Sequence, residues 1–278
     1  MTFLSLLLVL GVVWTTRWRL RLQRDGWWRA LLAEVELHVV GRHSSIALIV
    51  VVGVPLLILA LVLAVLKPVA YGWLLLPVHV LVLLYSLGRH DPRQALAGFR
   101  DSWRRGDLEA AALRAEQDLG LQAETPDGLL ARVQEQLLWR GHEGFFAVIF
   151  WYVVLGPLMA LAYRLVALTA AHARSPALRA HAEQLCHAFD WLPARLLTAS
   201  FALVGDFLCA SRATLSEWLN WDIPTPKLLA DAGRAAADLP VALDAEAGVH
   251  SLDTLWQLLV RAAVLWYVLL ALWTVVGR

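Results

Sequence analysis

The stretch LLWRGHEGFFAVIFWYVVLGPL, residues 137–158, places three titratable side chains directly before a long apolar run. These are Arg140, His142 and Glu143, and the residues from Gly144 onward are almost purely apolar. Such charges are either the solvated rim of a membrane helix, which is common at helix ends, or part of a binding site. The remainder of the sequence is needed to weigh these two interpretations.

The composition indicates an integral membrane protein. Of the 278 residues, 59% are hydrophobic and only 17% are charged, and the mean hydropathy is +0.60, which is too apolar for a soluble domain of this length. The apolar block 3–14 could be a secretory signal, but its arginines follow the block instead of preceding it, so we expect it to stay in the mature chain. No stretch alternates long enough to form a sheet, which predicts an all-α fold.

Several apolar segments are candidates for membrane-spanning helices, which need about 20 residues. Three segments meet this length clearly: Ser45–Leu66, Gly144–Leu168 and Leu255–Val276. A fourth, 69–87, follows the first after Lys67 and Pro68, which predicts a tight hairpin. The block 3–14 and the segment 196–210 are weaker candidates. The sequence therefore predicts a polytopic transmembrane protein with about four to six membrane segments.

The segment 88–141 is the largest polar part of the chain, and its arginines predict a cytoplasmic location by the positive-inside rule. Its alanine, leucine, glutamate and arginine residues at helical spacing predict amphipathic helices. Gly120 is expected to end one of them. Thr125 is expected to cap the next, with Pro126 at its first helical position.

Four tryptophans alternate with arginines near the N-terminus, in WTTRWRLRLQRDGWWR. One interpretation of Trp14, Trp18, Trp27 and Trp28 is an interfacial helix that binds anionic lipid head groups. The other, which we favour, is an ordinary aromatic belt beside a positive-inside signal. Both make membrane lipids the expected partner of this segment.

Three ionisable residues interrupt the apolar runs: His79, Asp206 and Arg261. Such groups are costly at membrane depth and usually face a bundle interior or a watery cavity, so each is a functional-site hypothesis. An ion pair between Asp206 and Arg261 that holds two helices together is the structural alternative to a polar cavity. A transport pathway along these residues is the weakest functional interpretation.

No metal site is predicted. The sequence HEGFF at 142–146 lacks the second histidine of H-E-x-x-H, which excludes a zincin site. The cluster of His172, His181, Cys186 and His187 matches no zinc spacing. A phosphate-binding loop of the P-loop type is also absent from the sequence.

Two blocks, VQEQLLWRGHEGFFAVIFWYVVLGPLMALAYRLV (133–166) and FDWLPARLL (189–197), resemble the AmpE family. Members of this family are inner-membrane modulators of β-lactamase induction, encoded beside the anhydromuropeptide amidase AmpD. The resemblance covers nearly the whole chain, and the D-W-[LV]-P-x-R-L block at 190–196 is its most specific part. It implies a single AmpE-like membrane domain over 1–278, in the bacterial inner membrane, with 88–141 as its cytoplasmic helical segment.

The same blocks are more distantly similar to the CobD/CbiB cobalamin-biosynthesis proteins, which join an aminopropanol unit to a corrinoid carboxylate. The chain keeps Glu135, Glu143 with Gly144, and the block from Trp191 to Leu196. Other polar positions of that motif are replaced, by Trp139, Arg140, Ala167, Ala170, Cys186, His187 and Asp190. An amide ligase needs oxygen ligands for magnesium and groups that hold phosphate. The losses predict that the fold is shared while the chemistry is not.

The resemblance therefore favours a regulatory protein over an enzyme, linked to peptidoglycan recycling and antibiotic resistance. It implies a muropeptide ligand or AmpD as partner, with no nucleic acid. A membrane enzyme with a reduced CobD-like site, for which ATP and magnesium would be cofactors by resemblance, is the main alternative, and a muropeptide transporter is a weaker one. The predicted ligand or partner face comprises Glu135, Arg140, His142, Glu143, Asp190, Trp191 and Arg195.

Overall fold

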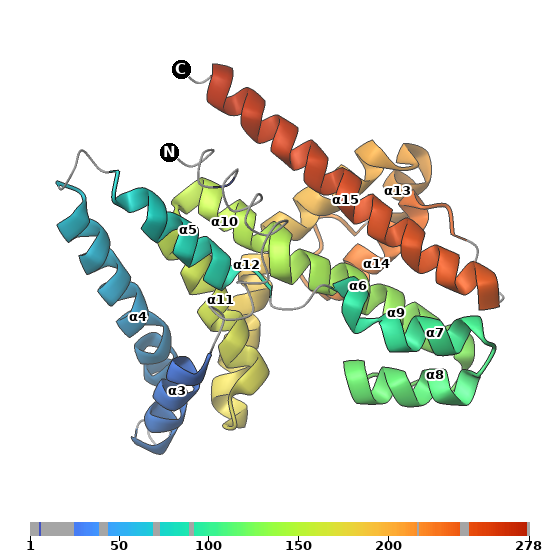
Figure 1. Cartoon of the computed structure of the whole chain (residues 1–278), viewed down its shortest axis with the longest axis horizontal. Helices are drawn as coiled ribbons and strands as arrows, with labels where there is room; N and C mark the ends of the chain where they lie inside the picture. The colour runs from blue at the N-terminus through green and yellow to red at the C-terminus, as the bar shows by residue number, and fades with distance from the viewer. Residues whose placement is uncertain are drawn as a thin grey trace. The chain divides into compact units, whose positions relative to one another are not determined.

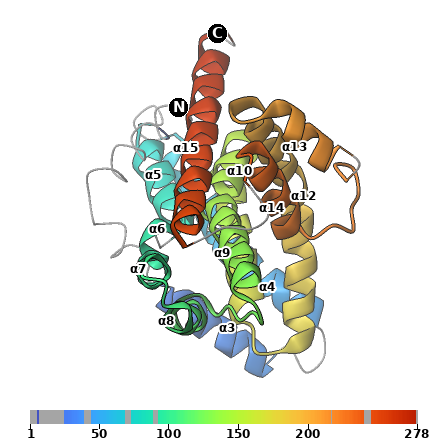
Figure 2. The same ribbon diagram turned by 90° about the vertical axis from the view of Figure 1, so that its right-hand side faces the viewer.

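The computed structural model shows a helical protein (Figures 1 and 2). It describes Leu6 and residues 25–38, 44–68, 73–88, 92–215, 217–239 and 245–276. No β-strand occurs among these residues, so the prediction of an all-α fold is confirmed. The chain forms two compact units: a first unit of residues 1–89 and 147–190, and a second unit of residues 90–146 and 191–278.

The helices of the first unit are α3 (Gly26–His38), α4 (Ser44–Leu66), α5 (Leu75–Ser86), α10 (Ala147–Leu155), α11 (Pro157–His172) and the first half of α12 (Pro176–Val204). Helix α11 packs against α4 and α5 around an apolar core. Trp28 of α3 is fully buried there, and its ring meets the ring of His172 edge-on, with centroids 6.0 Å apart. Glu36 accepts the backbone N–H groups of Arg174 and Ser175, which ties α3 to the turn before α12.

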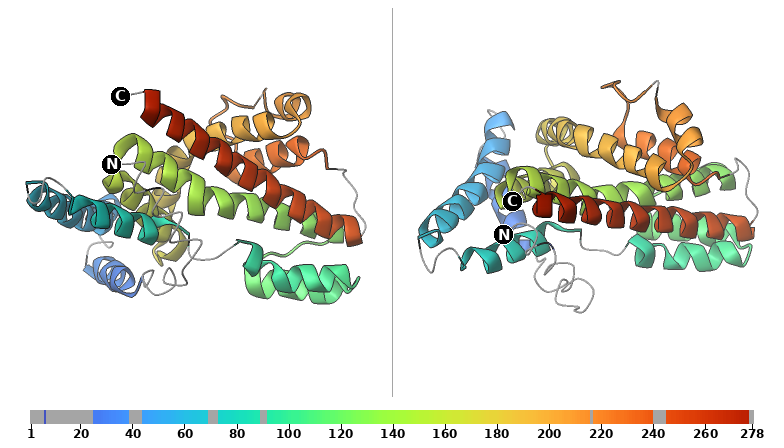
Figure 3. Two further views of the ribbon diagram at one scale, coloured as in Figure 1. Left: turned by 45° about the horizontal axis from the view of Figure 1, so that its top comes forward. Right: turned by 90° about the horizontal axis from the view of Figure 1, so that it is seen from above.

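The second unit contains α6 (Pro92–Ala95), α7 (Ala97–Arg104), α8 (Leu108–Arg114), the π-turn η2 (Ala115–Leu119), α9 (Pro126–Gly141), the π-turn η3 (His142–Phe146), the end of α12, α13 (Phe207–Thr214), α14 (Thr225–Ala236) and α15 (Ala245–Val276). Helix α9 contacts both α14 and α15, and α15 also runs beside α7 (Figures 2 and 3). The core of this unit therefore forms around α9.

Glycines allow these helices to approach α9 closely. A Cβ atom added at Gly141 would lie 3.0 Å from Leu259 Cδ1 of α15, and one at Gly233 of α14 would lie 2.6 Å from Leu138 Cδ1 of α9. A buried hydrogen bond of 2.8 Å joins Gln134 of α9 to the hydroxyl of Ser251 on α15. Small residues at the contacts and this paired polar group fix how α9, α14 and α15 pack.

The predicted helix ends in the segment 88–141 are confirmed. Gly120 follows η2 with φ 70° and ψ 26°, the left-handed conformation that glycine adopts without steric cost. Thr125 caps α9, because its hydroxyl accepts the N–H of Gly128 at 3.2 Å, and Pro126 occupies the first helical position. Helix α9 therefore starts at Pro126, as the sequence predicts.

The prediction of the membrane spans is confirmed only in part. Two described helices are long and apolar enough to cross a membrane: α4 over Ser44–Leu66, and α15 over Glu246–Val276. The expected span 69–87 contains the shorter helix α5, which begins at Leu75, and residues 69–72 lie outside the described residues. Block 3–14 apart from Leu6, together with Trp14 and Trp18, also lies outside them.

The prediction of one continuous helix over Gly144–Leu168 is wrong. Helix α10 ends at Leu155, and α11 begins at Pro157. Gly156 between them has φ 82° and ψ −168°, a backbone conformation that is essentially restricted to glycine. Pro157 favours a new helix start, because its missing N–H needs no partner at the first helical position. The apolar run is therefore two short helices.

The weaker candidate 196–210 is not one helix either. Helix α12 ends at Val204, and α13 begins at Phe207. The exposed side chain of Asp206 accepts the N–H of Cys209 at 2.9 Å and so caps α13. Aspartate is among the preferred residues at this position, so the break has a local cause.

Replacing Gly156 tests the break between α10 and α11. We expect Gly156→Ala to lower the free energy of unfolding by about 1–3 kcal/mol, because an alanine Cβ disfavours this backbone conformation. No atom lies within 4 Å of that Cβ position, so the loss reports backbone strain alone. The measurement is denaturant unfolding of the purified chain in detergent.

Gly53→Ala is the matched control, since Gly53 lies within α4 with equally open space around it and an ordinary helical backbone. Alanine is the better helix former there by roughly 0.5–1 kcal/mol, so no loss of stability is expected. Equal unfolding free energies for Gly156→Ala and the unchanged chain would contradict the break.

Candidate functional site

The sequence HEGFF forms the π-turn η3, which continues α9 without an interruption of the helix. The N–H of His142 bonds to the carbonyls of Leu138 and Trp139. A π-turn has one residue more per turn than an α-helix, and such turns occur frequently at functional sites. From the sequence, Gly141 and Gly144 are candidate helix breakers, but Gly141 is the last residue of α9 and Gly144 lies within the π-turn.

The three titratable residues of the opening stretch differ in their surroundings. His142 is fully buried, and its ring lies 5.7 Å from that of Trp139, so it does not belong to a solvated rim. Arg140 is exposed, and its Nη1 lies 3.9 Å from Glu143 Oε2, with 22% of the Glu143 side chain exposed. An ion pair of this length at the surface contributes little stability. Glu143 therefore remains partly accessible beside a cation.

Glu135 lies on α9 about two turns before Glu143 and is half-buried. Both glutamates belong to the second unit. Glu135, Arg140, His142 and Glu143 are thus held on one continuous helical segment, α9 with η3. This segment is the part of the predicted face that the structure keeps together.

Asp190 belongs to the first unit, whereas Glu135 and Glu143 belong to the second. Its side chain is 2% exposed, and its Oδ1 accepts a hydrogen bond of 2.8 Å from the hydroxyl of Tyr163. This bond joins α12 to α11 within the first unit. The geometry gives Asp190 a structural role that the sequence does not reveal.

Arg195 is 4% exposed, and its guanidinium donates to three backbone carbonyls. Nη1 bonds to Trp191 O at 2.9 Å, Nη2 to Asn220 O at 2.7 Å, and Nε to Trp218 O. Burial lowers the pKa of this guanidinium from its ordinary value, which is so high that the group stays protonated. Arg195 thus joins the segment 217–222 to α12.

Trp191 completes this arrangement. Its ring stacks on that of Trp221 with centroids 5.9 Å apart, and the Cζ atom of Arg195 lies 4.1 Å from the Trp191 ring centroid. A guanidinium at this distance from an indole makes a favourable cation–π contact. We name Trp191, Arg195, Trp218, Asn220 and Trp221 the arginine clamp. The only sequence signal for its second half is the pattern W-x-N-W at 218–221.

The three ionisable residues predicted at membrane depth lie in three separate places. His79 of α5 is half-buried, and its Nδ1 lies 2.9 Å from the hydroxyl of Tyr152 on α10. Asp206 caps α13, as described above. Arg261 is exposed on α15, and no ion pair joins it to Asp206 among the described residues. The ion pair between Asp206 and Arg261 is therefore not formed among the described residues, and a transport pathway stays a hypothesis.

Comparison with known proteins gives the family. The family model described as "Regulatory signalling modulator protein AmpE" matches residues 1–223. The chain belongs to the AmpE family. The matched residues include α9, η3, Asp190 and the arginine clamp. No solved structure matches the chain significantly.

A curated relative of this AmpE-family chain is the cobalamin biosynthesis protein CobD of Stutzerimonas stutzeri (strain A1501). The two are 28% identical over an alignment of 188 positions, which covers 64% of the chain and 60% of the relative. The chain therefore spans less than two thirds of the length of this relative. The match agrees with the distant similarity to CobD proteins that the sequence motifs indicate.

The structure shows no preformed metal site among the described residues. No three histidine, cysteine, aspartate or glutamate side chains gather as a ligand group in the described part of the chain. Asp190 is engaged by Tyr163, and Arg195 is engaged by three carbonyls. Arg195, which the CobD blocks share, and Asp190, which replaces one of their polar positions, thus make contacts within the protein.

The arginine clamp is testable by removing its guanidinium. We expect Arg195→Ala to lower the free energy of unfolding by about 2–4 kcal/mol, because three carbonyls lose a charged donor. Arg212→Ala removes the same charge from an exposed position on α13 and should change stability by less than about 0.5 kcal/mol. Denaturant unfolding in detergent measures both, and equal effects of the two substitutions would refute the clamp.

Proposed function

We propose that this AmpE-family protein is an inner-membrane signalling modulator that links the state of peptidoglycan recycling to β-lactamase induction. The observation that supports this most directly is the match of the AmpE model, whose description names a regulatory signalling modulator, over residues 1–223. The long apolar helices α4 and α15 agree with a membrane location. The link to cell-wall recycling comes from the role of AmpE proteins.

The proposed topology is multi-pass, with four to six membrane segments in one AmpE-like domain over 1–278. Helices α4 and α15 are two of these segments. The shorter apolar helices α5, α10 and α11 are the remaining candidates, since pairs of short helices can cover the depth of a bilayer together when neighbouring protein satisfies their ends. The arginine-rich segment 88–141 lies on the cytoplasmic side.

The ligand or partner protein that carries the signal binds at the cytoplasmic face of α9 and η3. Glu135, Arg140 and Glu143 are there, at least partly accessible and on one continuous helical segment. Partly buried carboxylates form stronger hydrogen bonds than fully solvated ones. They suit a ligand with amide or ammonium donors, such as a muropeptide, or a matching surface of the amidase AmpD.

The remaining residues of the predicted face have an indirect role. His142 and Asp190 are buried, and Trp191 and Arg195 hold the segment 217–222. Their contacts lie within their own units, so we assign them a structural role. The proposed binding face is thereby reduced to Glu135, Arg140 and Glu143.

Induction experiments in cells test this face. We expect Glu135→Gln and Glu143→Gln to shift the β-lactam dose response toward that of cells that lack the chain. A lost charge-assisted hydrogen bond should weaken ligand binding by about tenfold or more. The measurement is β-lactamase activity against inducer concentration, with the amount of the chain in the membrane determined by immunoblot.

Glu124→Gln is the matched control, because Glu124 is exposed and precedes α9, outside the proposed face. It should behave as the unchanged chain. The proposed face is wrong if Glu135→Gln and Glu143→Gln, present at normal levels, also give an unchanged dose response.

A second candidate function is that of a membrane enzyme that acts on a muropeptide or nucleotide at the same glutamates. The CobD relative favours it. The test is thermal unfolding of the purified chain with and without ATP and magnesium. Stabilisation that disappears in Glu135→Ala and Glu143→Ala but persists in Glu124→Ala would support the enzyme, and no stabilisation would count against it.

A further inference from the structure

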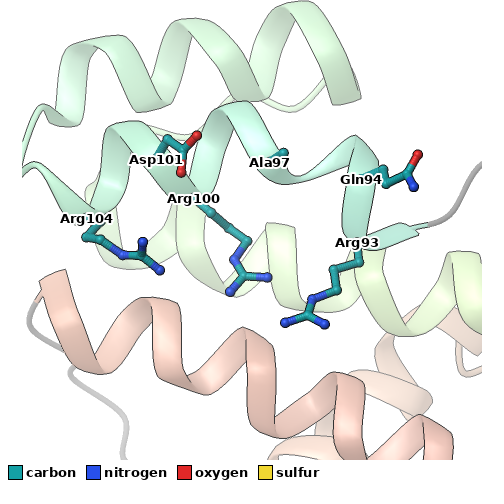
Figure 4. Close-up of a pocket in the computed structure, with 6 residues that line it drawn as sticks. All are labelled: Arg93, Gln94, Ala97, Arg100, Asp101 and Arg104. Carbon is teal, nitrogen blue, oxygen red and sulfur yellow. The ribbon is translucent and has the colours of Figure 1, made fainter.

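An open hollow lies on the second unit, apart from the face of α9 and η3. It is formed by α6 and α7 and has a volume of about 430 Å³. In Figure 4, three arginine side chains extend from these helices toward α15, whereas Asp101 extends away from α15. The hollow is lined by Arg93, Gln94, Ala97, Arg100, Asp101 and Arg104.

Positive charge exceeds negative charge on the α15 side of this hollow. Asp253 of α15 accepts a hydrogen bond of 2.6 Å from Arg100 Nη2 and one of 3.1 Å from Arg93 Nη2. One carboxylate thus lies between two guanidiniums. Arg104 adds a third guanidinium, and no ion pair to it occurs within the described residues. Three guanidiniums thus stand against the two carboxylates of Asp253 and Asp101, so one positive charge is in surplus among the described residues.

The paired side chains of Arg100 and Asp253 are partly shielded from water, whereas those of Arg93 and Arg104 are exposed. The side chain of Arg100 is 14% exposed and that of Asp253 is 28% exposed, whereas that of Arg93 is 52% exposed. Charges near a low-dielectric wall act on an incoming anion more strongly than fully solvated ones. Guanidinium groups also match the geometry of phosphate oxygens through paired N–H donors. The hollow therefore suits a phosphate group.

An apolar stripe begins on α15 beyond this hollow. Val260, Val264 and Val268 follow Asp253 by 7, 11 and 15 residues, which places them within about 60° of Asp253 around the helix. They are 45%, 58% and 50% exposed. A ligand that holds an anionic group at Asp253 and apolar chains farther along α15 would match both features.

The level of Asp253 along α15 agrees with a lipid head group. Asp253 precedes Leu255, where the apolar run begins, by two residues, or about 3 Å of helix rise. The head-group layer on each side of the hydrocarbon core is about 5–7 Å thick. If α15 crosses the membrane, the guanidiniums lie at the depth of the phosphates.

We infer that this hollow binds the phosphate of an anionic phospholipid in the cytoplasmic leaflet, with the acyl chains along Val260, Val264 and Val268. The arginines supply the attraction to the head group, and the valine stripe distinguishes a lipid from a soluble phosphate. Asp253 holds two of the arginines in place and limits the surplus charge. This site is separate from Glu135 and Glu143, so its failure would leave the proposed signalling face untouched.

The test measures binding of the full chain in detergent to fluorescent phosphatidylglycerol and, for comparison, phosphatidylcholine. We expect a preference for phosphatidylglycerol, and a loss of about fivefold in its affinity for each arginine removed near the surface. Arg104→Gln breaks no ion pair among the described residues and should lower the affinity about fivefold. Arg93→Gln with Arg104→Gln should lower it about 25-fold, while the bond from Arg100 to Asp253 remains.

Arg105→Gln is the matched control. It removes the same charge one residue away, from a guanidinium that bonds to the hydroxyl of Ser102 and does not line the hollow. Asp253→Asn should strengthen binding, because it removes the competing carboxylate. A cooperative thermal unfolding transition is required of each variant as evidence that it is folded. If the other variants do not fold, the affinity of Arg104→Gln alone decides the test.

Three results would overturn the inference. One is equal affinity for the two lipids, and another is equal loss for Arg105→Gln and Arg104→Gln, which would show surface charge without a site. The third is displacement of phosphatidylglycerol by glycerol 3-phosphate at a comparable concentration, which would assign the hollow to a soluble phosphate. The inference is supported if the unchanged chain retains phosphatidylglycerol in excess glycerol 3-phosphate and the double variant does not.

Discussion

Satisfaction of backbone hydrogen bonds in apolar surroundings is the constraint on which this fold depends, because lipid and packed side chains offer no substitute partners. The chain meets it in two ways on leaving α9. The π-turn η3 continues the helix while it accommodates an additional residue, and the His142 N–H bonds to the carbonyls of Leu138 and Trp139. At the break, Gly156 N–H still bonds to Tyr152 O at 2.9 Å, and Pro157 has no N–H to satisfy. Short helices are thus possible within an apolar run.

The two sequence blocks that resemble the AmpE family coincide with places where the chain passes between its compact units. One crossing lies between Phe146 and Ala147, directly after the π-turn, and another lies between Asp190 and Trp191. On one side of the second crossing, Asp190 bonds to Tyr163, and on the other, Arg195 binds three carbonyls. Asp190 and Arg195 thus hold the backbone on either side of this crossing.

The arginines of this chain inform two different conclusions, one from their distribution along the sequence and one from their contacts in the structure. As a bias in composition, it predicts which segments face the cytoplasm. In the structure, Arg195 is a buried clamp that binds carbonyls, whereas Arg93 and Arg100 share Asp253 beside an open hollow. The same side chain therefore serves packing in one place and leaves surplus charge in another, according to how many partners surround it.

The sequence by itself determined the helices whose signals lie within one or two turns: α4, the apolar part of α15, and α9 with its cap at Thr125. The break at Gly156 also had a local signal, the pair Gly-Pro, which the length of the apolar run obscured. Of the candidate site, the sequence indicated its glutamates and Arg195 but could not give their surroundings. The partners of Arg195 lie 23 and 25 residues away, and those of Asp253 lie 153 and 160 residues away. Only the tertiary structure decided these, because they depend on which helix faces meet.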